Sequence, residues 1–227
     1  HCTRIMIYTH NLMKIYLDTA DIEEIRAANE TGLIDGVTTN PTLILRSGRT
    51  LPDVAKQLVE EFPHFESIST EVVADTVEEM VNQGLSYKDL GSAITIKLPC
   101  TVEGLKACKN LSNSGIKTNV TLIFSAAQAV LAAKSGATYV SPFVGRLDDN
   151  SVAGLEVVRS ISELYRMYGV ETNIISASIR SVHRAVRSWY NGARIVTMPP
   201  KVFWDMYEHI LTKDGLERFQ QDWNMSQ

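Results

Sequence analysis

Ala93-Ile94-Thr95-Ile96-Lys97-Leu98-Pro99 is a short apolar run, rich in β-branched residues, that carries one lysine near its end. Side chains alternate between the two faces of a strand, so Lys97 points away from the face that holds the isoleucines and Leu98. A strand of a parallel sheet covered by helices is buried on both faces. The run therefore predicts such a strand, with an amine held in a poorly solvated interior.

The lysine in this run has two interpretations. Burial disfavours the ammonium form, and a neutral amine can add to a carbonyl group to form a Schiff base. The alternative is an exposed lysine at a strand end, since lysines are rarely fully buried. The run by itself leaves both interpretations open.

Similar apolar runs alternate with amphipathic segments from Met13 onward, and eight such pairs can be counted. The strand candidates begin near Lys14, Gly36, Ser67, Ala93, Thr118, Thr138, Thr172 and Arg194. Asp21 is placed to cap a helix over residues 21–29, and several helical segments end on a glycine, as helices commonly do. These glycines are Gly32, Gly115, Gly136, Gly169 and Gly192. The spacing is typical of repeated βα units.

Eight consecutive βα units in this length predict a single (β/α)8 TIM barrel of class α/β, near the small end of its size range. A doubly wound open sheet is the competing fold, but it usually has fewer strands and often a Gly-rich phosphate loop. No G-x-G-x-x-G motif occurs in the sequence. We take residues 13–227 as one catalytic domain and residues 1–12 as a tag or upstream segment outside the fold.

Composition narrows the possible functions. The 227 residues are 44% hydrophobic and 21% charged, with a formal net charge of −4. The absence of long like-charge runs gives no support to a nucleic-acid or membrane-surface role. Three cysteines without a CxxC pair favour a reducing, cytoplasmic setting. The five histidines are scattered, so we expect no metal and no cofactor.

Polar residues cluster where the predicted strands end, which is where barrel enzymes place their functional groups. Asp18 could act as a general acid/base or cap the next helix, although Asp21 fills the second role better. Asn40 precedes Pro41, a pair that commonly forms a turn. Glu71 would be costly to bury without water, Thr121 or Lys97 as a partner.

Two arginines follow late strands of the predicted barrel. Arg146 and Arg180 lie where many barrels bind phosphate, and the guanidinium fork matches phosphate oxygens. Each could also be an ordinary surface arginine. Taken together, the strand-end residues favour a phosphorylated substrate.

These residues form motifs that resemble a known family, the small transaldolases, which are class I aldolases and include fructose-6-phosphate aldolase. The resemblance runs over essentially the whole chain from Met13. Its motifs are Leu17-Asp18-Thr19, Gly36-Val37-Thr38-Thr39-Asn40-Pro41, Ile96-Lys97-Leu98-Pro99, Asn119-Val120-Thr121-Leu122-Ile123-Phe124, Ser141-Pro142-Phe143-Val144-Gly145-Arg146 and Ala177-Ser178-Ile179-Arg180. Ile179 departs from the pattern, because relatives usually carry phenylalanine there.

The resemblance implies roles for individual residues. Lys97 corresponds to the Schiff-base lysine and Asp18 to the general acid/base, while Glu71 and Thr121 correspond to the pair that holds the catalytic water. The positions that orient the sugar are Asn40, Asn119 and Ser141. The positions that bind phosphate are Arg146, Ser178 and Arg180.

The implied activity is transfer of a dihydroxyacetone unit between ketose and aldose phosphates, as in the pentose phosphate pathway, without a metal. Relatives specialised as fructose-6-phosphate aldolases carry tyrosine at the position of Phe143 and glutamine at that of Glu71. The pair in this chain resembles the transaldolase branch. The alternatives are a fructose-6-phosphate aldolase, a non-catalytic phosphosugar-binding barrel and a metal-dependent aldolase or isomerase barrel.

The C-terminal segment indicates a partner subunit. Residues 213–227 carry Leu216, Phe219 and Trp223 at helical spacing beyond the eighth βα unit. An extra amphipathic helix with nothing of its own to cover suggests a second chain. We therefore expect a homo-oligomer, and the resemblance implies a ring that is commonly a decamer.

Overall fold

The computed structural model describes residues 13–227 as a closed barrel of eight parallel strands, paired in sequence order with the first strand beside the last. The predicted (β/α)8 barrel is confirmed. The strands are β1 (Lys14–Asp18), β2 (Gly36–Thr38), β3 (Ser67–Glu71), β4 (Ile94–Pro99), β5 (Thr118–Ile123), β6 (Tyr139–Pro142), β7 (Asn173–Ser176) and β8 (Ile195–Met198). Residues 1–12, which we interpreted as a tag or upstream segment, lie outside the described residues.

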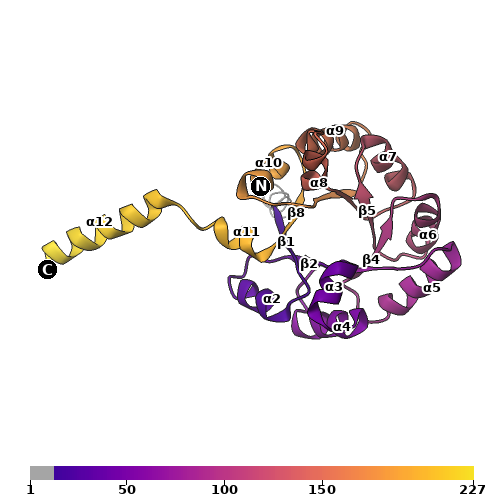
Figure 1. Ribbon diagram of the computed structural model, residues 1–227, viewed down its shortest axis with the longest axis horizontal. Helices are drawn as coiled ribbons and strands as arrows, with labels where there is room; N and C mark the ends of the chain where they lie inside the picture. Colours follow the sequence, from indigo (N-terminus) through magenta and orange to yellow (C-terminus); the bar gives the residue numbers. More distant parts are fainter. Residues whose placement is uncertain (1–12) are drawn as a thin grey trace, which may run out of the picture.

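Helices surround this barrel in a ring (Figure 1). They are α2 (Ile22–Asn29), α3 (Pro41–Ser47), α4 (Leu51–Glu61), α5 (Val77–Lys88), α6 (Val102–Asn113), α7 (Ala126–Lys134), α8 (Val144–Asp149), α9 (Gly154–Met167), α10 (Val182–Tyr190) and α11 (Pro200–Asp205), while α12 (Ile210–Ser226) follows outside the ring. A single apolar core joins the outer faces of the strands to the inner faces of these helices.

The predicted helix boundaries follow from local chemistry. The Asp21 side chain accepts hydrogen bonds from the backbone N–H groups of Glu23 and Glu24, which begins α2. All five glycines expected at helix ends have positive φ, for example +75° at Gly32. Glycine adopts this left-handed conformation without the steric cost that a Cβ brings.

The structure differs from the sequence prediction in the loops at the C-terminal ends of the strands. Short helices α3 and α8 precede the main helices after β2 and β6, where we expected one helix for each strand. The Asn40-Pro41 pair is more than a turn: the Asn40 side chain accepts a hydrogen bond from the Leu43 N–H at 2.9 Å and begins α3. Pro41 then occupies a first-turn position that lacks an N–H partner in any case.

Inside the barrel, the N-terminal end is filled by an apolar cluster of Tyr16, Tyr139, Ile175 and Ile195. Tyr16 packs so tightly on β2 that a Cβ at Gly36 would lie 2.9 Å from its ring. This position therefore requires glycine. Because this cluster closes the N-terminal end, the opposite end of the barrel is the place where a ligand can enter.

The last helix stands apart from the barrel. Figure 1 shows α12, drawn in yellow, extending away from the ring of helices, and none of its residues is buried. Its exposed apolar side chains include Leu216, Phe219 and Trp223. The extra C-terminal helix is therefore confirmed, and the homo-oligomer stays a prediction. Within residues 13–227, no helix has the length and apolar character needed to cross a membrane.

Candidate active site

A pocket of about 580 Å³ opens at the C-terminal ends of the strands. Seven of the residues expected in the site line it: Asp18, Asn40, Glu71, Lys97, Thr121, Phe143 and Arg146. They come from β1 to β6 and the loops that follow. The barrel thus brings Asp18 and Arg146, which are 128 positions apart in the sequence, to one cavity.

Lys97 lies on β4 with only 6% of its surface exposed. Register pairs it with Glu71 on β3 and with Asn119 on β5, which places the three side chains on the inner side of the barrel. The Lys97 Nζ donates a hydrogen bond to the Thr39 carbonyl at 3.1 Å. The interpretation as an exposed lysine at a strand end is therefore wrong, because this amine is buried and borders the pocket.

Asp18 ends β1 and faces the same interior. The Thr38 hydroxyl donates a hydrogen bond to its carboxyl at 2.9 Å and also lies 2.5 Å from the Thr197 hydroxyl. Burial raises the pKa of Asp18, while the Lys97 charge and the Thr38 hydrogen bond oppose this shift. Asp21, rather than Asp18, caps the next helix, so Asp18 remains available for proton transfer.

Glu71 and Thr121 lie on opposite sides of Lys97, on β3 and β5. Burial raises the pKa of Glu71; the Lys97 charge lowers it and the Asp18 carboxyl raises it further. Within residues 13–227, the buried Thr121 hydroxyl has no hydrogen-bond partner. A carboxyl and a free hydroxyl on either side of an amine can together hold a water molecule, which is the role the resemblance implies.

Asn119 and Ser141 lie in the barrel interior and do not line the pocket. The Ser141 hydroxyl donates a hydrogen bond to the Asn119 side-chain oxygen at 2.8 Å, which orients the amide. The buried Asn119 Nδ2 has no partner in the described part of the chain. The amide therefore has a donor left for a ligand, whereas its oxygen is already used.

Of the three expected phosphate ligands, Arg146 alone lines the pocket. Its guanidinium lies 5.4 Å from the centre of the Phe143 ring. Ser178 and Arg180 lie beside it: the Gly145 N–H donates to the Ser178 carbonyl at 2.9 Å, and a Cβ on Gly145 would lie 2.9 Å from the Arg180 Nε. Arg180 forms an ion pair with Asp149 at 2.5 Å. The structure thus brings this trio together, with one arginine already paired.

Our sequence reasoning missed several residues that line the pocket: Thr42, Leu43, Arg46, Leu122 and Pro199. Three of them lie on α3, which was not predicted. Leu122 has a φ of +58°, in the left-handed region, at a register shift between β5 and β6. Such strain in a non-glycine residue is common at functional sites. A sequence offers no signal for it.

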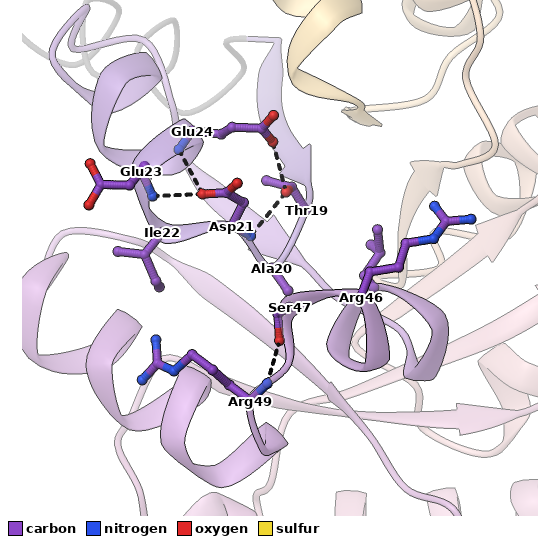
Figure 2. A pocket seen from close by; sticks show the side chains of 10 residues that line it. Thr19, Ala20, Asp21, Ile22, Glu23, Glu24, Arg46, Ser47 and Arg49 are labelled. Atoms are coloured by element: carbon purple, nitrogen blue, oxygen red, sulfur yellow. Dashed lines mark hydrogen bonds between the residues drawn. The ribbon is translucent and has the colours of Figure 1, made fainter.

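Arg46 also borders a second, neighbouring pocket of about 570 Å³ between α2 and α3. Figure 2 shows Asp21, Glu23 and Glu24 on the α2 side of this pocket, with Arg46 on the other side. On the α2 side, the Thr19 hydroxyl donates a hydrogen bond to the Glu24 carboxylate at 3.1 Å. The acidic side chains here are exposed or used as caps, and none of the ionisable residues that line this pocket is buried within residues 13–227.

The pocket at the strand ends therefore combines a buried amine with two carboxyls whose pKa values are raised. This set suits covalent chemistry on a carbonyl compound with proton transfer beside it. Within the described residues, no three His, Cys, Asp or Glu side chains are grouped as a metal site.

Comparisons with known proteins show which family the chain resembles. The family described as transaldolase/fructose-6-phosphate aldolase matches residues 15–227. Two curated relatives are called "probable transaldolase". The one from Moorella thermoacetica is 51% identical to this chain, and the match covers 93% of this chain and 97% of that protein. The one from Paracoccus denitrificans is 48% identical, and the match covers 93% of this chain and 96% of that protein. The thiamine phosphate pyrophosphorylase of Pyrococcus furiosus shares the fold, with a TM-score of 0.55 and 20% identity over 83% of this chain and 86% of that one.

Proposed function

The chain belongs to the transaldolase/fructose-6-phosphate aldolase family, and we propose that it is a transaldolase that acts through a Schiff base on Lys97. It transfers a dihydroxyacetone unit from sedoheptulose 7-phosphate to glyceraldehyde 3-phosphate, which gives erythrose 4-phosphate and fructose 6-phosphate, a reaction of the pentose phosphate pathway. The observation that carries the proposal is the buried Lys97 amine beside Asp18 and Glu71 in one pocket.

In the first half of the reaction, the Lys97 amine loses its proton and adds to the C2 ketone of the donor. Glu71 and Thr121 hold the water that leaves, and the resulting iminium is the electron sink. Asp18 then takes the proton of the C4 hydroxyl, and the C3–C4 bond breaks. An aldose phosphate departs, while the dihydroxyacetone enamine stays on Lys97.

In the second half, the enamine attacks the carbonyl of another aldose phosphate. Asp18 returns its proton to the new hydroxyl, and water from the Glu71–Thr121 pair hydrolyses the iminium. The raised pKa of Asp18 suits this double role, because a carboxyl with a pKa nearer to neutrality both accepts and donates a proton readily.

Substrate contacts follow from the same placement. Arg146 binds the phosphate, with Ser178 and Arg180 beside it, and Arg180 exchanges its Asp149 partner for a phosphate oxygen. Asn40 and Asn119 orient the sugar hydroxyls, and Ser141 holds the Asn119 amide in place.

Group transfer is favoured over simple aldol cleavage by Phe143 and Glu71. Phe143 lines the pocket with a ring that offers no hydroxyl, so it can neither donate a proton nor hold a water at the enamine. The enamine should therefore persist until an aldose acceptor arrives. The second candidate, a fructose-6-phosphate aldolase, would instead release free dihydroxyacetone.

Borohydride reduction in the presence of fructose 6-phosphate, followed by mass spectrometry, tests the proposal. We expect a dihydroxyacetone-derived adduct on Lys97, and an adduct on another lysine, or none, would contradict the Schiff-base assignment. Erythrose 4-phosphate should greatly accelerate turnover. If dihydroxyacetone is released as fast without the acceptor as heptulose forms with it, the aldolase candidate is correct. Phe143→Tyr should narrow the difference between the two rates.

We also propose that the protein is a homo-oligomer in a reducing, cytoplasmic setting. Since α12 buries none of its residues and exposes Leu216, Phe219 and Trp223, a second copy of the chain is the occupant that would cover these side chains. Light scattering at micromolar concentration should give an assembly larger than one chain. A monomer would refute this part of the proposal.

A further inference from the structure

Thr197 lies on the last strand, β8, and belongs to a chain of two hydroxyls that ends on the Asp18 carboxyl. The Thr38 hydroxyl donates a hydrogen bond to Asp18 Oδ1 at 2.9 Å, and the Thr38 and Thr197 hydroxyl oxygens lie 2.5 Å apart. The three residues come from adjacent strands, because β1 lies between β2 and β8 in the barrel. The two threonines therefore bridge the inner side of β1 next to Asp18.

The direction of both hydrogen bonds follows from the number of protons. A hydroxyl has a single proton to donate, and an ionised carboxyl can only accept. Because Thr38 donates its proton to the Asp18 carboxylate, it can only accept from Thr197. Thr197 is therefore the donor of the second bond, and its proton keeps the Thr38 O–H directed at Asp18. Consecutive hydrogen bonds of this kind also strengthen each other.

Solvent has little access to this chain of hydroxyls. Thr38 and Thr197 are 2% and 3% exposed, and neither lines the active-site pocket, whereas Asp18 does. Thr197 can therefore act on the pocket only through Thr38. Loss of the Thr197 hydroxyl would remove a hydrogen bond at a buried oxygen, where water does not readily replace it.

The hydrogen bond from Thr38 acts on Asp18 together with several charges. Burial raises the pKa of Asp18, while the Lys97 charge and the Thr38 hydrogen bond both lower it. The strands on either side of β1, which are β2 and β8, consist of non-ionisable residues. On α11, which packs on β1, Lys201 and Asp205 pair with each other at 2.7 Å. The other charged residues that line the pocket are Glu71, Arg46 and Arg146. Weakening of the Thr38 bond should therefore raise the pKa of Asp18 further.

We propose that Thr197 is a positioning residue for proton transfer: its hydroxyl orients that of Thr38, which holds one oxygen of the Asp18 carboxylate and leaves the other oxygen to the substrate. The inference rests on the proposed function, because it concerns the step in which Asp18 takes the proton of the C4 hydroxyl. Sugar binding and formation of the Schiff base on Lys97 do not depend on Thr197.

Thr197→Val tests the proposal, because valine keeps the shape of threonine and removes the hydroxyl. With fructose 6-phosphate and erythrose 4-phosphate, we expect kcat at neutral pH to fall about two- to tenfold, the factor that one hydrogen bond contributes, while KM stays unchanged. The acid limb of the dependence of kcat on pH should move to higher pH, since a larger share of Asp18 is protonated at each pH. Thr197→Ala should show the same shift, which keeps the test decisive if Thr197→Val folds poorly.

Thr197→Ser separates positioning from packing. Serine keeps the hydroxyl and loses a buried methyl group, so this variant should have a lower free energy of unfolding and an unchanged pH profile. Thr95→Val is the matched control. The Thr95 hydroxyl lies 2.7 Å from that of Ser67 in the barrel interior, and neither residue lines the pocket, so the pH profile should again be unchanged.

A Thr197→Val protein with the pH profile of the unmodified protein would overturn the inference, and so would an equal shift in Thr197→Ser or Thr95→Val. Borohydride trapping on the unmodified protein tests the proposed function separately. An adduct on Lys97 together with an unshifted profile in Thr197→Val would mean that the positioning role alone is wrong. No adduct and no turnover in the unmodified protein would overturn both.

Discussion

Both ends of the barrel interior contain polar groups, but the two ends differ in how many of these groups have a protein partner. At the N-terminal end, the Tyr16 hydroxyl donates to Glu66 at 2.7 Å, the Lys117 amine donates to the Glu66 carbonyl at 2.7 Å, and Lys14 lies 3.3 Å from the Glu66 carboxylate. The hydroxyls of two further inward residues lie 2.7 Å apart: Ser67 and Thr95. Each of these groups therefore has a protein partner.

Around Lys97 the pattern is reversed. Three buried side-chain atoms of the barrel strands have no partner within residues 13–227: Ser69 Oγ, Asn119 Nδ2 and Thr121 Oγ1. By strand register, Asn119 lies in the same layer of inward side chains as Lys97, and Ser69 and Thr121 lie in the layers directly next to it. Two carboxyls with raised pKa values lie there as well. Unpaired buried polar groups cost stability, so we expect the C-terminal end to stabilise the fold less than the N-terminal end does and to keep its free donors and acceptors for the proposed ligand.

The largest effect should come from Lys97→Arg at the ligand-binding end. Arginine keeps the positive charge but stays protonated and cannot add to a carbonyl. We expect transaldolase turnover to fall by roughly 10⁶-fold, as it does when other catalytic nucleophiles are removed. A coupled assay of fructose 6-phosphate consumption with erythrose 4-phosphate measures this. Lys117→Arg, at the other end, is the matched control, and a comparable loss there would remove the distinction between the two ends.

Asp18→Asn should lower turnover by about 10²- to 10⁴-fold, the usual contribution of a general acid/base. It should also raise stability at neutral pH. Because burial raises the pKa of Asp18, the folded state binds this proton more tightly than the unfolded state. The stability from this group is therefore full below the unfolded pKa and is lost as pH rises through the folded pKa. The gain from asparagine should appear at neutral pH and vanish in acid.

Urea denaturation at several pH values, together with the pH dependence of turnover, measures both effects. Asp21→Asn is the control, because asparagine caps a helix about as well as aspartate and should change neither quantity. An Asp18→Asn protein that is less stable at neutral pH would mean that the carboxylate supports the fold.

Features that depend on local sequence could be predicted, and features that depend on tertiary contacts could not. The strands, the barrel and the Asp21 cap follow from residue periodicity and local hydrogen bonding, so they could be predicted. Residues that line the pocket could be predicted where they lie near the end of a strand, as Asp18 and Lys97 do. Arg46 was missed because it lies on α3, a short helix with no buried residue and hence no apolar periodicity. The left-handed backbone of Leu122 depends on strand register, which is set by tertiary contacts.

Arg146→Ala should have an intermediate effect that depends on the substrate. Its guanidinium lines the pocket without an anionic partner among the described residues, so it is available to a phosphate. We expect kcat/KM for fructose 6-phosphate to fall by an amount equivalent to about 1.5–3 kcal/mol, the contribution of a charged hydrogen bond, mostly through KM. Unphosphorylated fructose should be little affected. Arg184→Ala, whose arginine is paired with Asp148, is the control, and equal losses for both sugars would exclude Arg146 from the phosphate site.

The smallest effect should come from Tyr16→Phe at the N-terminal end, and it should concern stability alone. Tyr16 is fully buried, and burial raises the pKa of its phenol, so the hydroxyl stays a donor to Glu66. Phenylalanine keeps the ring that packs on Gly36 and removes this single hydrogen bond. Glu66 is 37% exposed at its side chain and can turn to water, so the loss should be only about 0.5–1.5 kcal/mol of the free energy of unfolding.

The same variant should keep its kcat and its KM for fructose 6-phosphate, because Tyr16 lies at the closed end, away from the residues that line the pocket. Urea denaturation and steady-state kinetics on one preparation give both answers. A fall in kcat without a fall in stability would show that the hydrogen bonds at the N-terminal end position the groups around Lys97. The two ends of the barrel interior would then act as one unit, and the separation between a paired, stabilising end and an unpaired, ligand-binding end would be wrong.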